Sequence, residues 1–65
     1  MNEMYKLKYK DKWMKITRVL GTYSYELYDN ASEVDSLNYR KALSGRNLVA
    51  EDCNLNKDEI LIVKI

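Results

Sequence analysis

The residue types that usually perform catalysis or bind metals are scarce in this 65-residue sequence. Histidine, the commonest general base and metal ligand, is absent, and Cys53 is the sole cysteine. A thiol without an imidazole partner predicts neither a zinc site nor a cysteine nucleophile, so we interpret Cys53 as a small, partly buried side chain. A lone cysteine also cannot form an intramolecular disulfide, which favours a reducing compartment such as the cytoplasm.

The acidic side chains include two pairs of sequence neighbours, Glu51-Asp52 and Asp58-Glu59. On a strand, neighbouring side chains point to opposite faces, so neither pair forms an acid–base dyad there. We interpret both pairs as solvated charges. With two glycines in the whole chain, a glycine-rich phosphate loop is not expected either. The sequence therefore predicts a non-enzymatic protein with no cofactor and no metal.

Lysines and two aromatic residues remain as candidates for function. The candidate partner-binding residues are Lys6, Lys8, Lys10, Trp13, Lys15 and Tyr28. Their ammonium groups could meet an anionic surface while the rings provide contact area or stack on bases. A solvated face, on which long lysines screen one another, is the alternative interpretation.

The candidate residues belong to a stretch, residues 5–28, in which apolar and polar side chains alternate. A period of two is typical of half-buried strands. It predicts an antiparallel three-stranded meander with strands at 5–10, 13–20 and 23–28. We expect the apolar side chains to face a core and the lysines to face outward.

Two short loops set the expected register. Gly21, as the first residue of a two-residue loop, indicates a type II′ turn, because that position needs a positive φ. This turn pairs Ile16 with Leu27, and a second loop at residues 11–12 pairs Leu7 with Ile16. Both turns therefore predict one core row, Leu7–Ile16–Leu27.

The same register defines the opposite face. It places Lys15 between Lys8 on the first strand and Tyr28 on the third, and it places Lys10 beside Trp13. Like charges directly opposite each other are mildly unfavourable in a sheet. We therefore expect either solvent or an anionic partner to cover this face.

The second half of the chain gives weaker signals. Residues 33–43 fit a short helix capped at Ser32 and followed by a turn at 44–47, but a strand is also open for this segment. A short strand is expected at 48–50. The apolar run 60–65 predicts an interior strand, or one that closes a small barrel.

Length, charge and composition limit the class of protein. Residues 1–65 are expected to form a single domain that is mainly β (all-β or small α+β), SH3-like or barrel-like. The net charge of +1 predicts no strong field toward nucleic acid, and no apolar run is long enough to span a bilayer. Abundant Lys, Asn, Tyr and Ile without proline is typical of AT-rich genomes, as in phage and mobile-element accessory proteins.

Two functions compete on these observations. The first is a small protein-binding module, an adaptor or inhibitor that docks a sheet face or edge on a larger partner. The second is a small β-barrel that binds nucleic acid through the lysines and aromatic rings. The near-neutral charge and the acidic C-terminal half favour a protein partner. Both a monomer and a homodimer are compatible with the sequence.

Overall fold

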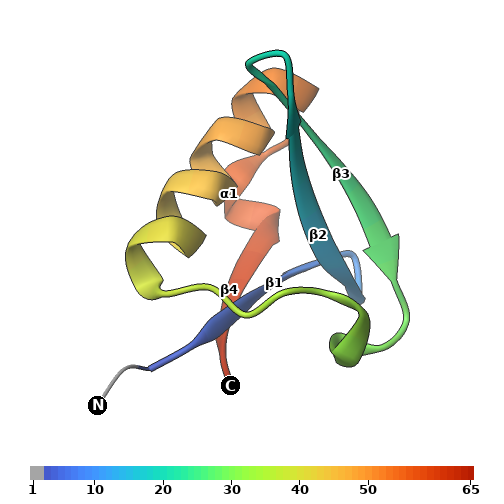
Figure 1. Ribbon diagram of the computed structural model, residues 1–65. Helices are drawn as coiled ribbons and strands as arrows, with labels where there is room; N and C mark the ends of the chain where they lie inside the picture. Colours follow the sequence, from blue (N-terminus) through green and yellow to red (C-terminus); the bar gives the residue numbers. More distant parts are fainter. Residues whose placement is uncertain (1–2) are drawn as a thin grey trace.

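The computed structural model describes residues 3–65, which form an antiparallel sheet with a helix packed on one face (Figure 1). The strands are β1 (Tyr5–Tyr9), β2 (Lys12–Val19), β3 (Thr22–Tyr28) and β4 (Ile60–Lys64), in the order β3-β2-β1-β4. Between β3 and β4 the chain forms η1 (Ala31–Glu33), α1 (Tyr39–Cys53) and η2 (Lys57–Glu59). The predicted small, mainly β domain, with a three-stranded meander and a C-terminal strand, is confirmed.

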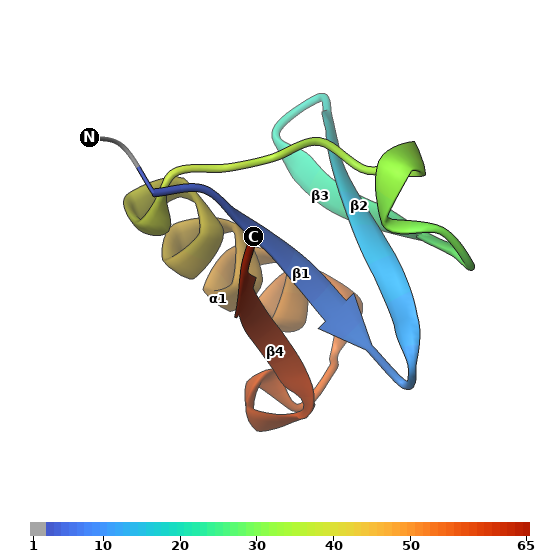
Figure 2. The ribbon, with the colours of Figure 1, turned by 90° about the horizontal axis from the view of Figure 1, so that it is seen from below.

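The sheet does not close into a barrel within the described residues. Strands β3 and β4 lie at opposite edges, and β4 pairs with β1 on one side only (Figure 2). The predicted barrel-like closure and the interior position of the C-terminal strand are therefore wrong. Ile60 is buried in the core whereas Leu61, on the other face, is 55% exposed. Residues 60–65 are apolar on both faces of the strand, but α1 covers only one of those faces. The composition of the run could not show this.

Each hairpin loop begins one residue earlier than predicted, at residues 10–11 and 20–21. All four loop residues have a positive φ, from 51° to 80°, as a type I′ turn requires. The earlier loops shift both pairings by two residues, so Leu27 lies opposite Met14 instead of Ile16. Because side chains alternate, a shift of two leaves every side chain that remains in β1, β2 or β3 on its predicted face.

The core lies between the sheet and α1. Its buried members are Leu7, Tyr9, Met14, Ala42, Val49, Ala50 and Ile60. Burying a large aliphatic side chain contributes roughly 1.5–3 kcal/mol. These contacts fasten α1 to one face of the sheet, so that the other face is not covered by α1.

The helix begins and ends later than the predicted helix at 33–43. Asn38 caps its N-terminus, where the side chain accepts a hydrogen bond from the Lys41 N–H (2.8 Å). Asn54, in the left-handed conformation, ends it. Ser32, the predicted cap, lies in η1 instead. The prediction of a helix in this part of the chain is confirmed, but the helix spans Tyr39–Cys53 and not 33–43.

Gly45 lies inside α1, although the sequence predicts a turn at 44–47 followed by a strand at 48–50. A Cβ atom at this glycine would meet Cδ1 of Ile16 at 3.0 Å. The absence of a side chain thus allows α1 to approach β2 closely. The predicted turn and strand are wrong because the glycine serves helix–sheet packing and not chain reversal.

Candidate functional site

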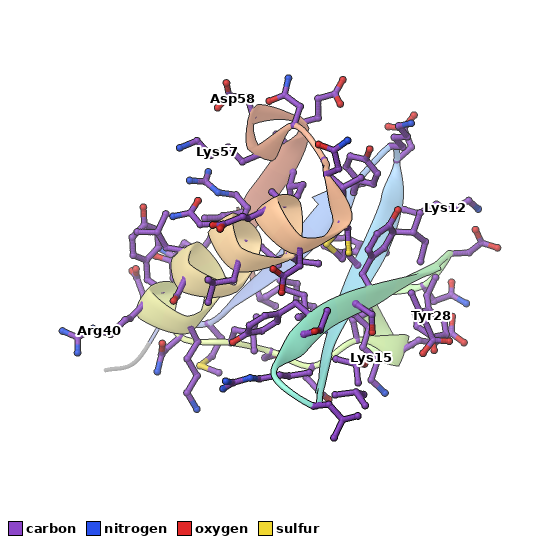
Figure 3. All side chains as sticks on the ribbon, turned by 90° about the horizontal axis from the view of Figure 1, so that it is seen from above. Lys12, Lys15, Tyr28, Arg40, Lys57 and Asp58 are labelled. Atoms are coloured by element: carbon purple, nitrogen blue, oxygen red, sulfur yellow. The ribbon has the colours of Figure 1, made fainter. Side chains whose placement is uncertain are left out.

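The face of the sheet opposite α1 carries most of the predicted site residues. We call it the open face and define it by Lys8, Trp13, Lys15, Tyr28 and Leu61, which alternate along their strands with core-facing residues. Lys15 and Tyr28 project from the β2–β3 hairpin on the side away from α1 (Figure 3). The predicted grouping of lysines and aromatic rings on one face is thus present for these residues.

A row of side chains crosses the open face from one edge of the sheet to the other. Leu61 of β4 pairs with Lys8 of β1, Lys8 with Trp13 of β2, and Trp13 with Tyr28 of β3. The Lys8 Nζ lies 5.1 Å from the centre of the Trp13 ring, which is cation–π geometry. Trp13 and Tyr28 are half-buried. We call these four residues the cross-strand row.

The observed register removes the predicted pairing of Lys8 with Lys15. Lys15 lies opposite Glu26 of β3, and Lys8 lies opposite Trp13. Opposite charges across two strands are a favourable pair, whereas two lysines would repel each other. The expected like-charge pair is therefore wrong, and the two-residue register shift is the cause.

Lys6 and Lys10 lie apart from the cross-strand row. Lys10 is a loop residue with a φ of 51°, and its Nζ lies 5.3 Å from the ring centre of Tyr9, which is buried in the core. Its predicted position beside Trp13 is wrong. Lys6 points to the side of the open face, where its Nζ donates a hydrogen bond to the Ala31 carbonyl oxygen. This contact holds η1 over that end of the face.

Charges of both signs surround the open face. Lys12 forms an ion pair with Asp29, and the hydrogen bond from the ammonium group, together with its charge, holds the pKa of the Asp29 carboxyl below its usual value. Lys15 likewise faces Glu26. The surroundings of the row are thus mixed in charge and not uniformly basic.

Leu61 belongs to the cross-strand row but is not among the binding residues predicted from the sequence. It lies in the run 60–65, in which consecutive apolar residues conceal the period of two. Only the pairing of β4 with β1 places it beside Lys8. No local signal in the sequence could have identified it.

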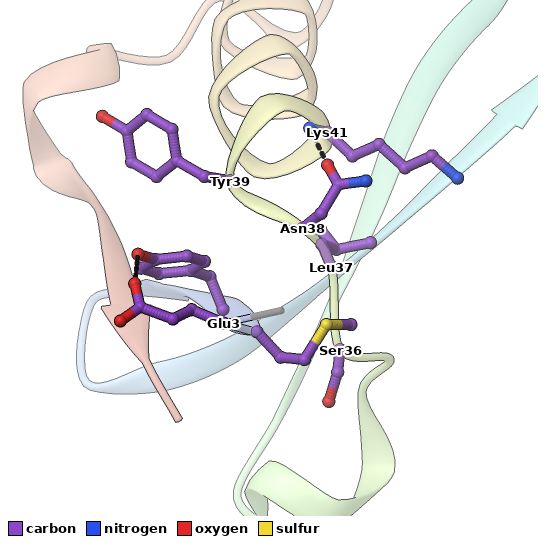
Figure 4. Close-up of a pocket in the computed structure, with 8 residues that line it drawn as sticks. Glu3, Ser36, Leu37, Asn38, Tyr39 and Lys41 are labelled. Atoms are coloured by element: carbon purple, nitrogen blue, oxygen red, sulfur yellow. Dashed lines mark hydrogen bonds between the residues drawn. The ribbon is translucent and has the colours of Figure 1, made fainter. Parts of the chain in front are cut away.

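A shallow hollow lies at the N-terminal end of α1 (Figure 4). The Tyr5 hydroxyl donates to Glu3 (2.9 Å), which raises the pKa of that phenol, and Asn38 accepts from the backbone of Lys41. The rings of Tyr5 and Tyr39 pack edge to face with their centres 5.3 Å apart. These polar groups serve the chain's own structure, so we assign no ligand site to the hollow.

No protein-family model, curated protein or solved structure matches this chain. Among residues 3–65, no helix has the length and apolar composition needed to cross a membrane. The same residues hold no cluster of three or more His, Cys, Asp or Glu side chains that could bind a metal ion. Arguments about function therefore depend on the geometry of the open face.

Proposed function

We propose that this chain is a small, non-enzymatic protein-binding module, of adaptor or inhibitor type, that binds its partner through the open face. The observation that carries the proposal is the cross-strand row, which aligns Leu61, Trp13 and Tyr28 on the face opposite α1. Aromatic side chains dominate binding energy where neighbouring residues exclude water from them. The residue usage fits a cytoplasmic accessory protein of a phage or mobile element.

The charges along the row indicate the chemistry of the partner. Lys8 and Lys15 lie on the two central strands beside Trp13, and the ammonium group of Lys8 lies over the ring. A protein surface with an apolar centre and carboxylates aligned with these lysines would be complementary to the face. Such carboxylates would steer association, while the rings would supply most of the affinity.

Nucleic acid is the alternative partner, because lysines beside aromatic rings are typical of surfaces that bind phosphates and bases. Two observations favour protein. Lys6 is engaged with Ala31 and Lys12 with Asp29, which leaves fewer ammonium groups for phosphates. The net charge of +1 also falls short of the usual basic footprint.

The proposal can be tested with affinity capture from a lysate of the source organism, followed by calorimetry with the partner identified. Trp13→Ala should weaken binding by about 2 kcal/mol or more, which is roughly 30-fold. Leu61→Asp should also weaken it, because a carboxylate would enter the apolar row. Leu48→Asp is the matched control, since Leu48 is exposed on α1. A partner that binds Trp13→Ala and Leu61→Asp as tightly as the wild type, or no more weakly than it binds Leu48→Asp, would contradict the proposal.

The alternative has its own assay. Fluorescence anisotropy with labelled single- and double-stranded oligonucleotides, at low and moderate salt, measures nucleic-acid binding directly. Binding that weakens steeply with salt and is lost in Lys8→Glu/Lys15→Glu would favour the alternative function. We expect no such binding.

A further inference from the structure

The outer edge of β4 presents backbone groups that point away from the sheet. Within the described residues β4 pairs with β1 alone, at the margin of the sheet (Figure 2). The Ile65 N–H donates to the carbonyl oxygen of the residue before β1 (2.9 Å). Because backbone groups alternate in direction along a strand, Leu61 and Val63 also bond toward β1. The N–H and C=O groups of Ile62 and Lys64 therefore point outward.

The edge of β3 is covered at Tyr23, near the start of that strand. The Tyr23 N–H donates to a carboxylate oxygen of Asp52 (2.8 Å), and the Cys53 thiol donates to the Tyr23 carbonyl oxygen (3.4 Å). The last turn of α1 thus occupies both outward backbone groups of that residue. Residues 3–65 place no such cover on Ile62 or Lys64. An uncovered strand edge is a template for another strand.

We propose that a second copy of this chain pairs with β4 as an antiparallel strand, so that two sheets become one across a two-fold axis. The charges at the two ends of β4 support this direction. The strand is preceded by Lys57, Asp58 and Glu59 in η2, a net negative segment whose first two residues are labelled in Figure 3, and it ends at Lys64. Antiparallel pairing centred on Ile62 brings the Lys64 ammonium of each copy to the acidic pair of the other.

The same pairing is consistent with the side chains of the strand. Leu61, which is 55% exposed, would lie opposite Val63 of the second copy. The two Ile62 residues would exchange a pair of backbone hydrogen bonds at the two-fold axis. The net charge of +1 opposes association only weakly. Since a five-residue strand buries a small area, the dimer should be weak and concentration-dependent.

The β4 edge shares Leu61 with the open face, but Lys64 lies outside the cross-strand row, so a test at Lys64 is independent of the proposed function. Sedimentation equilibrium of the wild type should show the mass double as concentration rises. Lys64→Glu should weaken the dimer roughly tenfold or more, because it sets like charges together at both ends of the strand pair. Adding Asp58→Lys and Glu59→Lys to that variant should restore the dimer.

Two controls separate the dimer contact from other effects. Glu3→Gln removes the carboxylate that lies 2.8 Å from Lys64 in the same chain, and it should leave the dimer intact. Trp13→Ala should also leave it intact, which distinguishes this contact from binding through the open face.

Amide hydrogen exchange provides a readout that needs no variant. The amides of Ile62 and Lys64 should become protected as concentration rises, whereas those of Leu61 and Val63 should be protected at every concentration. This alternating pattern is specific for pairing at the β4 edge. A wild type that stays monomeric overturns the proposal, and so does a dimer that Lys64→Glu does not weaken. Exchange at Ile62 and Lys64 that is independent of concentration also overturns it.

Discussion

The two edges of the sheet are held in different ways, although both belong to the same four-stranded sheet of residues 3–65. At the β3 edge, the end of α1 binds the outward backbone groups of Tyr23 through Asp52 and Cys53. At the β4 edge, Ile60 is buried to 1% exposure, and the outward groups of the following residues are uncovered. The β3 edge is thus covered at Tyr23 by polar contacts, whereas β4 is anchored by apolar burial.

This difference shows that the exposure of an edge is independent of its stability. Strand β4 is firmly attached through its core-facing side chain, yet its backbone is available to another strand. Strand β3 depends less on core burial, yet a contact from a residue 29 positions away in the sequence covers its edge at Tyr23. Proteins commonly protect the edges of their sheets, so the uncovered edge is the better candidate for association.

The largest effect is expected from truncating the anchor of β4. Ile60→Ala should destabilise the domain by about 2–5 kcal/mol, because a buried aliphatic side chain leaves a cavity. Leu61→Ala, on the same strand but the opposite face, should change the free energy of unfolding by about 0.5 kcal/mol or less. Urea denaturation at low protein concentration measures both. Similar losses for the two variants would show that β4 is not anchored through one face.

The closed edge can be opened at Asp52. Asp52→Ala removes the acceptor of the Tyr23 N–H and should cost about 0.5–1.5 kcal/mol, toward the lower end because the contact is exposed. The Tyr23 amide should also exchange faster with solvent. Glu51→Ala is the matched control, since within the described residues Glu51 forms no side-chain hydrogen bond. Unchanged exchange at Tyr23 would contradict the assignment of Asp52 as the cover of this edge.

The hairpin that carries β3 offers a stabilising substitution. Leu20 is fully exposed and has a φ of 53°, a conformation that costs a leucine energy. Leu20→Asn should stabilise the domain by roughly 0.5–1 kcal/mol, because Asn-Gly is the preferred type I′ pair. Thermal denaturation measures the change. Val19→Asn, in the extended strand beside it, should not stabilise, and a gain there would contradict the explanation.

The smallest effects concern one ion pair near each edge. Lys64 lowers the pKa of Glu3 beside β4, and Lys12 lowers the pKa of Asp29 after β3. A carboxyl whose pKa is depressed on folding stabilises the protein above its unfolded pKa, and this contribution is lost as pH falls through the folded pKa. Stability should therefore decline below the ordinary pKa values of 4.5 and 3.8.

Glu3→Gln and Asp29→Asn should each flatten part of that decline when the melting temperature is measured against pH. Both groups are at the surface, so each change should be small. A wild type and variants with the same acid dependence would show that neither pair contributes.

The strands and the faces of their side chains were predictable because they follow from a period of two along a short stretch. Leu7, Met14 and Leu27 share the core face, and Trp13 and Tyr28 share the open face, even though the predicted register was wrong by two residues. The error arose at the loops, where non-glycine residues adopt positive φ and give no strong signal in the sequence.

The alternation of apolar and polar side chains is a local property, so the residue order alone was sufficient to predict which face each strand side chain occupies. The limits of α1, the closure of one edge and the membership of Leu61 in the cross-strand row required contacts between distant segments. A glycine such as Gly45 can mark a turn or allow a helix to pack closely against a side chain, and only its contact with Ile16 shows that the second applies. Asp52 can bind the Tyr23 N–H only when α1 lies beside β3. These features depend on the docking of the helix on the sheet, because the energies that select them come from long-range packing and hydrogen bonds.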